Sequence, residues 1–274
     1  MCLLMIAWQA HPRYRLVVAA NRDEYHERPA APLAKWPPPA ALIGGRDLRA
    51  QGTWLAVDRE RRFGVVTNFR ELQRPQPGAP SRGDLIPSYL SATVPAARTR
   101  AGEFLAALEP RAPGYSGFNL LLSDADSLWY GSNRITPFAR PLAAGVYGLS
   151  NELLDTPWPK LQRVRGGFES WLRQGQPTSA SELFALLADR TPAQPTGSPE
   201  SAASAGSEHT GGLPPEWARI LSAPFVLHPQ YGTRCSTVVL LQPDGRLFIA
   251  ERRFDACGES TGETEFELAP GEWP

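Results

Sequence analysis

The sequence lacks several features that would place it in a familiar class of protein. It carries no net charge, because 28 lysine and arginine residues balance 28 aspartate and glutamate residues, so it has no basic surface for nucleic acid. Its three cysteines, Cys2, Cys235 and Cys257, include no C-x-x-C pair, and they indicate neither a disulfide framework nor a zinc ribbon. No apolar run approaches a membrane-spanning length, and the opening run, residues 2–8, lacks the positive residues and the cleavage site of a secretory signal. We expect a cytoplasmic protein without a transmembrane segment, and its oligomeric state stays open.

Histidine is also scarce. The chain has four, His11, His26, His209 and His228, and none lies in a C-x-x-C-H context or at the spacing of metal ligands. We therefore expect no metal site. His26 is the best single candidate for an axial haem ligand, but a solvated histidine is the simpler interpretation of an isolated residue of this type.

What the sequence does contain is material for one large domain, since 274 residues of which 42% are hydrophobic can bury a sizeable core. Short apolar segments bounded by proline, glycine or charged residues predict strands at residues 2–8, 16–20, 53–57, 63–67, 117–122, 128–130, 146–149, 237–241 and 247–251. Helical periodicity predicts helices at residues 83–90, 97–108, 160–172 and 181–189. Strands, then helices, then strands indicate an α+β fold, which we expect to form a single domain over residues 1–274.

Three local patterns add detail to this prediction. The sequence Pro243-Asp244-Gly245 joins the last two predicted strands and is a strong hairpin signal. The proline-dense residues 28–39 are expected to form a surface loop, because proline lacks the N–H that a strand or helix would use. Residues 191–212 are rich in proline, serine, alanine and glycine, and they have too few apolar side chains to offset their ordering entropy. We interpret this segment as a low-complexity loop inserted into the domain.

Cys2 is the first candidate for chemistry. Cysteine is small enough for the initiator methionine to be removed, and removal would leave a thiol and a free α-amine on one residue. An α-amine with a pKa of about 7.7–8.0 is partly neutral at physiological pH, and it can take the proton of a thiol whose pKa is about 8.5. Nucleophile and base then belong to the same residue. The alternative interpretation is that Cys2 is a small hydrophobic residue in an apolar strand.

A run of four polar residues, Asn21-Arg22-Asp23-Glu24, ends the apolar strand that begins at residue 16. Side chains alternate between the two faces of a strand, so Asn21 and Asp23 are expected on one face and Arg22 and Glu24 on the other. One of the two pairs would then reach a site near Cys2. The alternative is a turn with a solvated ion pair at the end of the first hairpin.

Short motifs of similar character continue along the chain. They are Met1-Cys2, Asn21-Arg22-Asp23-Glu24, Gly52-Thr53-Trp54-Leu55, Thr67-Asn68-Phe69, Gly117-Phe118-Asn119-Leu120, Tyr147-Gly148-Leu149-Ser150-Asn151, Thr156-Pro157-Trp158 and Tyr231-Gly232-Thr233-Arg234. In this order they resemble the NRDE family, also called the transport and Golgi organisation 2 proteins. The resemblance implies one of several functions: amide hydrolysis of the N-terminal-nucleophile (Ntn) type, haem handling, or binding of acyl-CoA or related lipids.

A more distant resemblance, to the choloylglycine and penicillin V acylase hydrolases, implies a fold and a nucleophile. The order and approximate spacing of the site residues in those enzymes are matched by Cys2, Asn21, Asp23, Asn68, Asn151 and Arg234. The resemblance implies a four-layer αββα Ntn sandwich of two mostly antiparallel sheets. In such a site Cys2 attacks an amide carbonyl, and hydrolysis needs no cofactor.

The same resemblance implies roles for the remaining catalytic candidates. Asp23 would hold the α-amine, Asn151 and donors near Asn68 would stabilise the oxyanion, and each such donor is worth about 3–4 kcal/mol when preorganised. Arg234 would lower the pKa of the thiol. Each residue also has a simpler interpretation, as a turn asparagine or as an arginine in a surface ion pair.

The chain departs from the acylase pattern at one position. Those enzymes have arginine immediately before the asparagine, whereas here Ala20 precedes Asn21 and the arginine is Arg22. Strand alternation could turn the Arg22 side chain away from Cys2 and leave a thiolate without its positive neighbour.

Two functions therefore stay open. The first is a cysteine amidohydrolase that acts on a small amide. The second is a binding protein without turnover, whose pocket takes haem, coenzyme A or an acyl chain. For this second function the candidate ligand-binding residues are Asn21, Arg22, Glu24 and His26, and Arg22 can contact a phosphate or a propionate with two hydrogen bonds.

Overall fold

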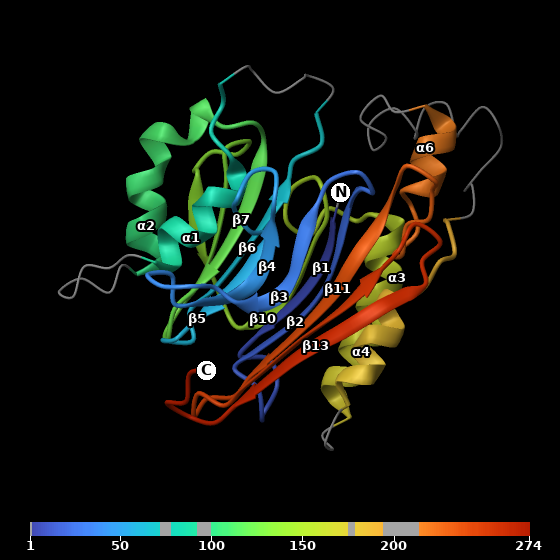
Figure 1. Ribbon diagram of the computed structural model, residues 1–274. Coiled ribbons are helices and arrows are strands. Elements are labelled where there is room, and N and C mark those ends of the chain that lie inside the picture. Colours follow the sequence, from blue (N-terminus) through green and yellow to red (C-terminus); the bar gives the residue numbers. More distant parts are fainter. Residues whose placement is uncertain (1, 72–77, 92–99, 175–178, 194–213) are drawn as a thin grey trace.

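Two antiparallel sheets and a small number of helices make up the molecule. The computed structural model describes residues 2–71, 78–91, 100–174, 179–193 and 214–274, and Figure 1 shows how their elements are arranged. One sheet has six strands in the order β10-β1-β2-β11-β12-β13, and the other has seven in the order β3-β4-β5-β6-β7-β8-β9. The strand pairings within both sheets are antiparallel. The predicted α+β class with two mostly antiparallel sheets is therefore confirmed.

The elements have the following bounds. The six-stranded sheet contains β1 (Cys2–Trp8), β2 (Leu16–Tyr25), β10 (Gly145–Leu149), β11 (Tyr231–Leu241), β12 (Leu247–Phe254) and β13 (Ser260–Leu268). The seven-stranded sheet contains β3 (Ala30–Lys35), β4 (Leu42–Asp47), β5 (Leu55–Asp58), β6 (Phe63–Asn68), β7 (Phe118–Ser123), β8 (Leu128–Ser132) and β9 (Ala139–Leu142). The helices are η1 (Arg82–Asp84), α1 (Leu85–Leu90), α2 (Ala101–Leu108), η2 (Glu109–Gly114), α3 (Pro159–Arg173), α4 (Ala180–Leu187) and α6 (Pro215–Ile220).

The largest apolar core lies between the two sheets, where Leu4 of β1 and Val65 of β6 belong to one buried cluster. Helices α3 and α4 cover the other face of the six-stranded sheet, and Phe168 packs there in a cluster with Leu3. Helices α1 and α2 cover the outer face of the seven-stranded sheet, where Leu105 is buried in a third cluster (Figure 1). Neighbours Leu3 and Leu4 therefore point to opposite faces of β1, as the pleat of a strand requires. This alternation decides where the side chain of Cys2 points.

Each predicted strand and helix overlaps an element of the structure. The hairpin at Pro243-Asp244-Gly245 is confirmed, since Gly245 has a φ of 92°, a value that favours glycine, and its N–H donates to Gln242 O at 3.1 Å. The predicted helix start at residues 97–99 and most of the inserted segment 191–212 lie outside the described residues, so these predictions remain untested. Among the helices of the described residues, none has the length and apolar character needed to cross a membrane.

One prediction was wrong. Residues 28–39 do not form only a loop, because β3 runs through them. β3 is an edge strand, and Pro32 lies in an irregularity of its pairing with β4, between Ala31 and Ala34. An edge strand tolerates proline because it need not donate at every position. The N–H of Leu33 donates to Glu251 Oε1 at 2.8 Å, which ties this edge to β12 of the other sheet.

Candidate functional site

The tetrad lies on β2, between β1 and β11 in the middle of the six-stranded sheet. Arg22 stands directly opposite Cys2 of β1 and Cys235 of β11. Residues directly opposite each other in an antiparallel pair share a face of the sheet. Cys2 and Arg22 therefore point to the same side, toward the seven-stranded sheet.

The expected alternation of the tetrad is present. Asn21 points toward the helices of the outer face and donates through Nδ2 to Leu187 O at 2.8 Å and to Pro224 O at 2.9 Å. Arg22 points between the sheets, where its guanidinium carbon lies 4.3 Å from the centre of the Trp54 ring. Arg22 is thus not turned away from Cys2, contrary to the concern raised by its shifted position. Ala20 and Arg22 are two residues apart on one strand, so the arginine stays on the same face.

Cys2 and Arg22 line a cleft of about 530 Å³ between the ends of the two sheets. Its other wall comes from the seven-stranded sheet and from the segment before α1, and includes Asp47, Trp54 and Asn68. Charged residues dominate the lining: the arginines are Arg22, Arg28, Arg49 and Arg82, and the acidic residues are Asp23, Glu24, Glu27 and Asp47. The lining therefore contains charged residues of both signs in equal number. Asp23 is buried, and its carboxyl accepts from Thr233 on the other face of β2.

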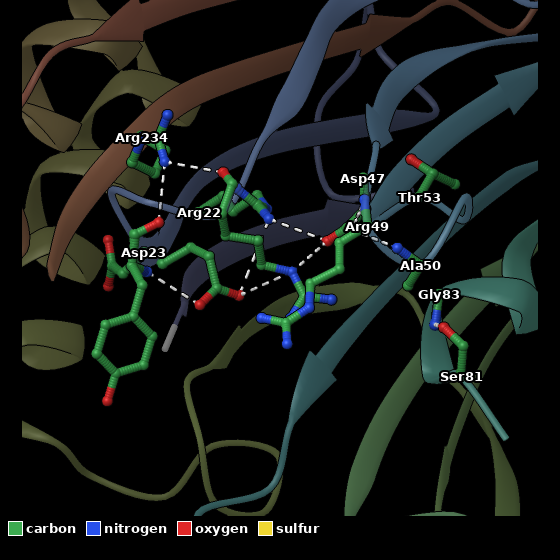
Figure 2. A network of polar contacts seen from close by, with 12 residues as sticks. Arg22, Asp23, Asp47, Arg49, Ala50, Thr53, Ser81, Gly83 and Arg234 are labelled. Carbon is green, nitrogen blue, oxygen red and sulfur yellow. Dashed lines mark hydrogen bonds and ion pairs between the residues drawn. The ribbon is translucent and has the colours of Figure 1, made fainter. Parts of the chain in front are cut away.

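Asp47 fixes two of these arginines to the wall of the cleft (Figure 2). Its Oδ2 accepts from Arg28 Nε at 2.6 Å and from Arg22 Nη2 at 3.4 Å, and its Oδ1 accepts two backbone N–H groups of the β4–β5 turn at 3.0 and 2.9 Å. Burial raises the pKa of Asp47, but the hydrogen bonds and charges of its partners outweigh burial and hold the pKa below its usual value. Glu24 lies 3.8 Å from Arg28 and 3.9 Å from Arg22. Arg22 still has a donor left, since its buried Nη1 makes no hydrogen bond within the described residues.

The backbone of Cys2 is held on both sides by the residues that follow β10. Its N–H donates to Asn151 Oδ1 at 3.0 Å, and its carbonyl oxygen accepts from Ser150 Oγ at 2.8 Å. Asn151 Nδ2 donates in turn to Asn68 O at 2.8 Å, while the Asn68 side chain is exposed at the cleft. The structure therefore brings Cys2, Asn68 and Asn151 together. Both polar atoms of the Asn151 side chain contact backbone groups, so it holds the cysteine in place.

The thiol of Cys2 needs a base at neutral pH. Burial raises its pKa, the positive charge of the amino terminus is the strongest influence that lowers it, and the charge of Arg22 lowers it less. A thiol in this environment is mainly protonated. The group nearest in the chain that can accept its proton is the nitrogen of the same residue, which becomes an amine if Met1 is removed.

Comparisons with known proteins show the family to which the chain belongs. A family model described as Transport and Golgi organisation 2 matches residues 1–256. The chain belongs to this family. It is 29% identical to the Transport and Golgi organization 2 homolog of Mus musculus over 98% of this chain and 99% of that protein, and 30% identical to the Homo sapiens homolog over 92% of each. It is 26% identical to Transport and Golgi organization protein 2 of Drosophila melanogaster over 100% of this chain and 95% of that protein.

The Gly52-Thr53-Trp54-Leu55 motif builds part of the far wall of the cleft. A Cβ on Gly52 would lie 2.4 Å from the carbonyl of Gly83, so glycine lets the β4–β5 turn approach the segment before α1. The N–H of Thr53 donates to Gly83 O at 3.0 Å, which fixes that approach. Trp54 then supplies the ring that packs against Arg22.

Asp23 lies on the opposite face of β2 from Arg22, the face that α3 and α4 cover, and it is buried. Its Oδ1 accepts from Thr233 Oγ1 at 2.7 Å, and its backbone carbonyl accepts from Tyr231 Oη at 2.9 Å. Burial raises the pKa of the Asp23 carboxyl, and the positive charge of Lys160 is the strongest opposing influence. Asp23 thus sits in an enclosed polar site that β2, β11 and α3 share.

Lys160 is a site residue that the sequence analysis missed. It lies in the first turn of α3 and is 1% exposed, beside the apolar residues Leu161, Val164 and Phe168 that the helix buries. The sequence did contain a signal for it. Lys160 follows the Thr156-Pro157-Trp158 motif closely, and its helical spacing from those apolar residues puts it on the same face of the helix. Lysine on the buried face of a helix is rare unless a charge compensates it.

Two predicted site residues lie away from the thiol. Arg234 Nη1 donates to the carbonyl oxygens of Tyr25, His26 and Arg28 at 3.0, 3.1 and 3.2 Å, and so holds the turn after β2 (Figure 2). It is not among the residues that line the cleft, and the guanidinium beside Cys2 is that of Arg22. His26 Nε2 lies 3.0 Å from His228 O, also outside the cleft lining. Within the described part of the chain, no group of three or more His, Cys, Asp or Glu residues is arranged to hold a metal ion.

Proposed function

We propose that this chain is a cysteine amidohydrolase of the Ntn type that acts on a small amide with an anionic group. The observation that carries the proposal is the placement of Cys2: its nitrogen is held 3.0 Å from Asn151 Oδ1 while its side chain lines the cleft beside Arg22. Helices on both outer faces of two stacked antiparallel sheets support the four-layer αββα sandwich of Ntn hydrolases as the fold. Removal of Met1 would turn the held nitrogen into the α-amine.

In the proposed reaction the α-amine takes the thiol proton as the sulfur attacks the amide carbonyl. The negative charge that develops on the carbonyl oxygen is stabilised by the positive charge of Arg22 and by the exposed amide of Asn68. The C–N bond then breaks, and the leaving amine takes the proton from the α-ammonium. Water hydrolyses the resulting thioester, which releases a carboxylic acid and restores the thiol. This chemistry requires no cofactor.

The arginines of the cleft favour an anionic substrate. Arg49 and Arg82 line the cleft together with Arg22 and Arg28, and a guanidinium matches a carboxylate or a phosphate with two parallel hydrogen bonds. We further propose a cytoplasmic location, because all three cysteines are free, as is usual in a reducing compartment.

A second candidate function is binding without turnover. The same four arginines support it, since they suit the propionates of haem or the phosphates of coenzyme A as well as a substrate. The position of His26 outside the cleft lining gives no support to its role as an axial ligand. Retention of a ligand together with an unreactive Cys2 would favour this function over hydrolysis.

The test compares two cysteines of one molecule. Intact and N-terminal peptide masses of the purified protein are taken before and after treatment with iodoacetamide at neutral pH, alongside a Cys2→Ala control. Cys257 is exposed and serves as the internal reference thiol. We expect loss of Met1 and alkylation of Cys2 about 10-fold faster than of Cys257, because an adjacent base enriches the thiolate. Retained Met1, or a Cys2 no faster than Cys257, contradicts hydrolysis and favours binding.

A further inference from the structure

Lys160 is the second of only two lysines in the chain, and the other, Lys35, is exposed. The Lys160 side chain is buried, and its Nζ makes no hydrogen bond within the described residues. An ammonium group in such a place is unfavourable unless an opposite charge compensates it. Its surroundings must therefore explain why lysine is present.

The charged groups around Lys160 come from several elements. Asp23 of β2 favours the ammonium form, as does Cys2 of β1 when ionised, whereas Arg70, which follows β6, opposes it. Burial lowers the pKa of Lys160 and raises that of Asp23, and each residue is the strongest influence opposing burial for the other. Tyr231 of β11 is enclosed with them, and burial raises its pKa well above the usual value, so it stays neutral. Asp23 and Lys160 are thus two buried groups of opposite charge, each of which stabilises the ionised form of the other.

The α-amine of processed Cys2 would join the same enclosure. Cys2 is paired with Arg22, the residue before Asp23 on β2, and the charge of the amino terminus is, after Lys160, the strongest influence that lowers the pKa of Asp23. One carboxylate compensates one cation, and two ammonium groups around it would repel each other. Either Lys160 or the α-amine is then charged at neutral pH, and a base has to be the uncharged one.

We propose that Lys160 is a positioning residue of the Cys2 site. Its buried ammonium compensates the charge of Asp23 and so keeps the α-amine of processed Cys2 neutral. The proposal rests on the proposed function, and it names the residue that keeps the catalytic base, the α-amine, uncharged. It also explains why a cation is buried on the side of β1 away from the cleft, where no substrate reaches it.

The first test titrates the α-amine directly. A Cys2→Ser background avoids transfer of acetyl groups from the thiol to the amine, and trace acetylation with acetic anhydride over a range of pH, read from the N-terminal peptide mass, gives the amine pKa. We expect Lys160→Met to raise this pKa by at least about one unit, because it removes a neighbouring positive charge. Lys35→Met is the matched control and should leave it unchanged. An amine pKa that is the same in the Cys2→Ser protein and in its Lys160→Met and Lys35→Met variants would overturn the proposal.

A second measurement uses the unsubstituted protein, in case Lys160→Met does not fold. Protein labelled with ¹³C at the ε-carbon of lysine has only two lysine signals, from Lys35 and Lys160. We expect the Lys160 signal to show an ammonium group at neutral pH, and a neutral amine would overturn the proposal. The N-terminal mass separates this failure from that of the proposed function. If Met1 is lost and Cys2 is reactive but Lys160→Met leaves the amine pKa unchanged, the Lys160 proposal alone is contradicted. Retained Met1 would contradict both the Lys160 proposal and the proposed function.

Discussion

Cys2→Ala is expected to lower kcat/KM for amide hydrolysis by about 10³-fold or more, because it removes the only atom proposed to bond to the substrate. Suitable probes are N-acyl-4-aminobenzoates with acyl groups from acetyl to dodecanoyl, since their carboxylate matches the arginines of the cleft. Release of 4-aminobenzoate is followed by fluorescence. The neutral N-acyl anilides serve as the comparison and should react more slowly.

The matched control is Cys257→Ala, which makes the same substitution at an exposed cysteine that does not line the cleft. It should retain the full rate. Turnover that survives Cys2→Ala, in a variant with an unchanged circular dichroism spectrum, would place the nucleophile elsewhere. An unsubstituted protein that binds the probes but hydrolyses none of them would support the binding function.

Asp23→Asn is expected to lower the free energy of unfolding by about 3–5 kcal/mol, because it leaves the buried ammonium of Lys160 without its compensating charge. Urea denaturation measures the loss. The exposed Asp126 provides the control, and Asp126→Asn should change stability by no more than about 0.5 kcal/mol.

A double variant separates the charge pair from other effects at Asp23. Asp23→Asn also weakens the hydrogen bond from Thr233, and that part of the loss does not depend on Lys160. Adding Lys160→Met to Asp23→Asn should recover much of the stability, because the uncompensated charge is then gone. Purely additive losses would show that Asp23 and Lys160 do not interact.

The apolar strands could be predicted from the sequence because burial on both faces leaves a strong pattern. β1 and the start of β2 are apolar at nearly every position, and both were found. The strands β3, β4, β9 and β13 were not predicted, although the edge strand β10 was. β3 contains a proline, and β13 has mostly exposed polar residues, so neither has the composition of a core strand.

The candidate site was predictable where alternation along one strand decides the geometry. The two faces of the Asn21–Glu24 tetrad follow from a period of two residues. The position of Arg22 relative to Cys2 depends instead on the register between β1 and β2, which no local pattern specifies. Arg234 and Lys160 depend on contacts between elements far apart in the chain. For that reason the sequence did not reveal that Arg234 holds the turn after β2, and Lys160 was missed.

The most direct test of the account is the mass of the Cys2 peptide during turnover. The processed protein is mixed with N-octanoyl-4-aminobenzoate, quenched in acid so that amines are protonated, and digested for mass spectrometry. The account predicts an octanoyl group on Cys2 that appears before 4-aminobenzoate release reaches its steady rate. Release of 4-aminobenzoate with no acyl group on Cys2, or retention of the intact probe in the cleft without release, would contradict it.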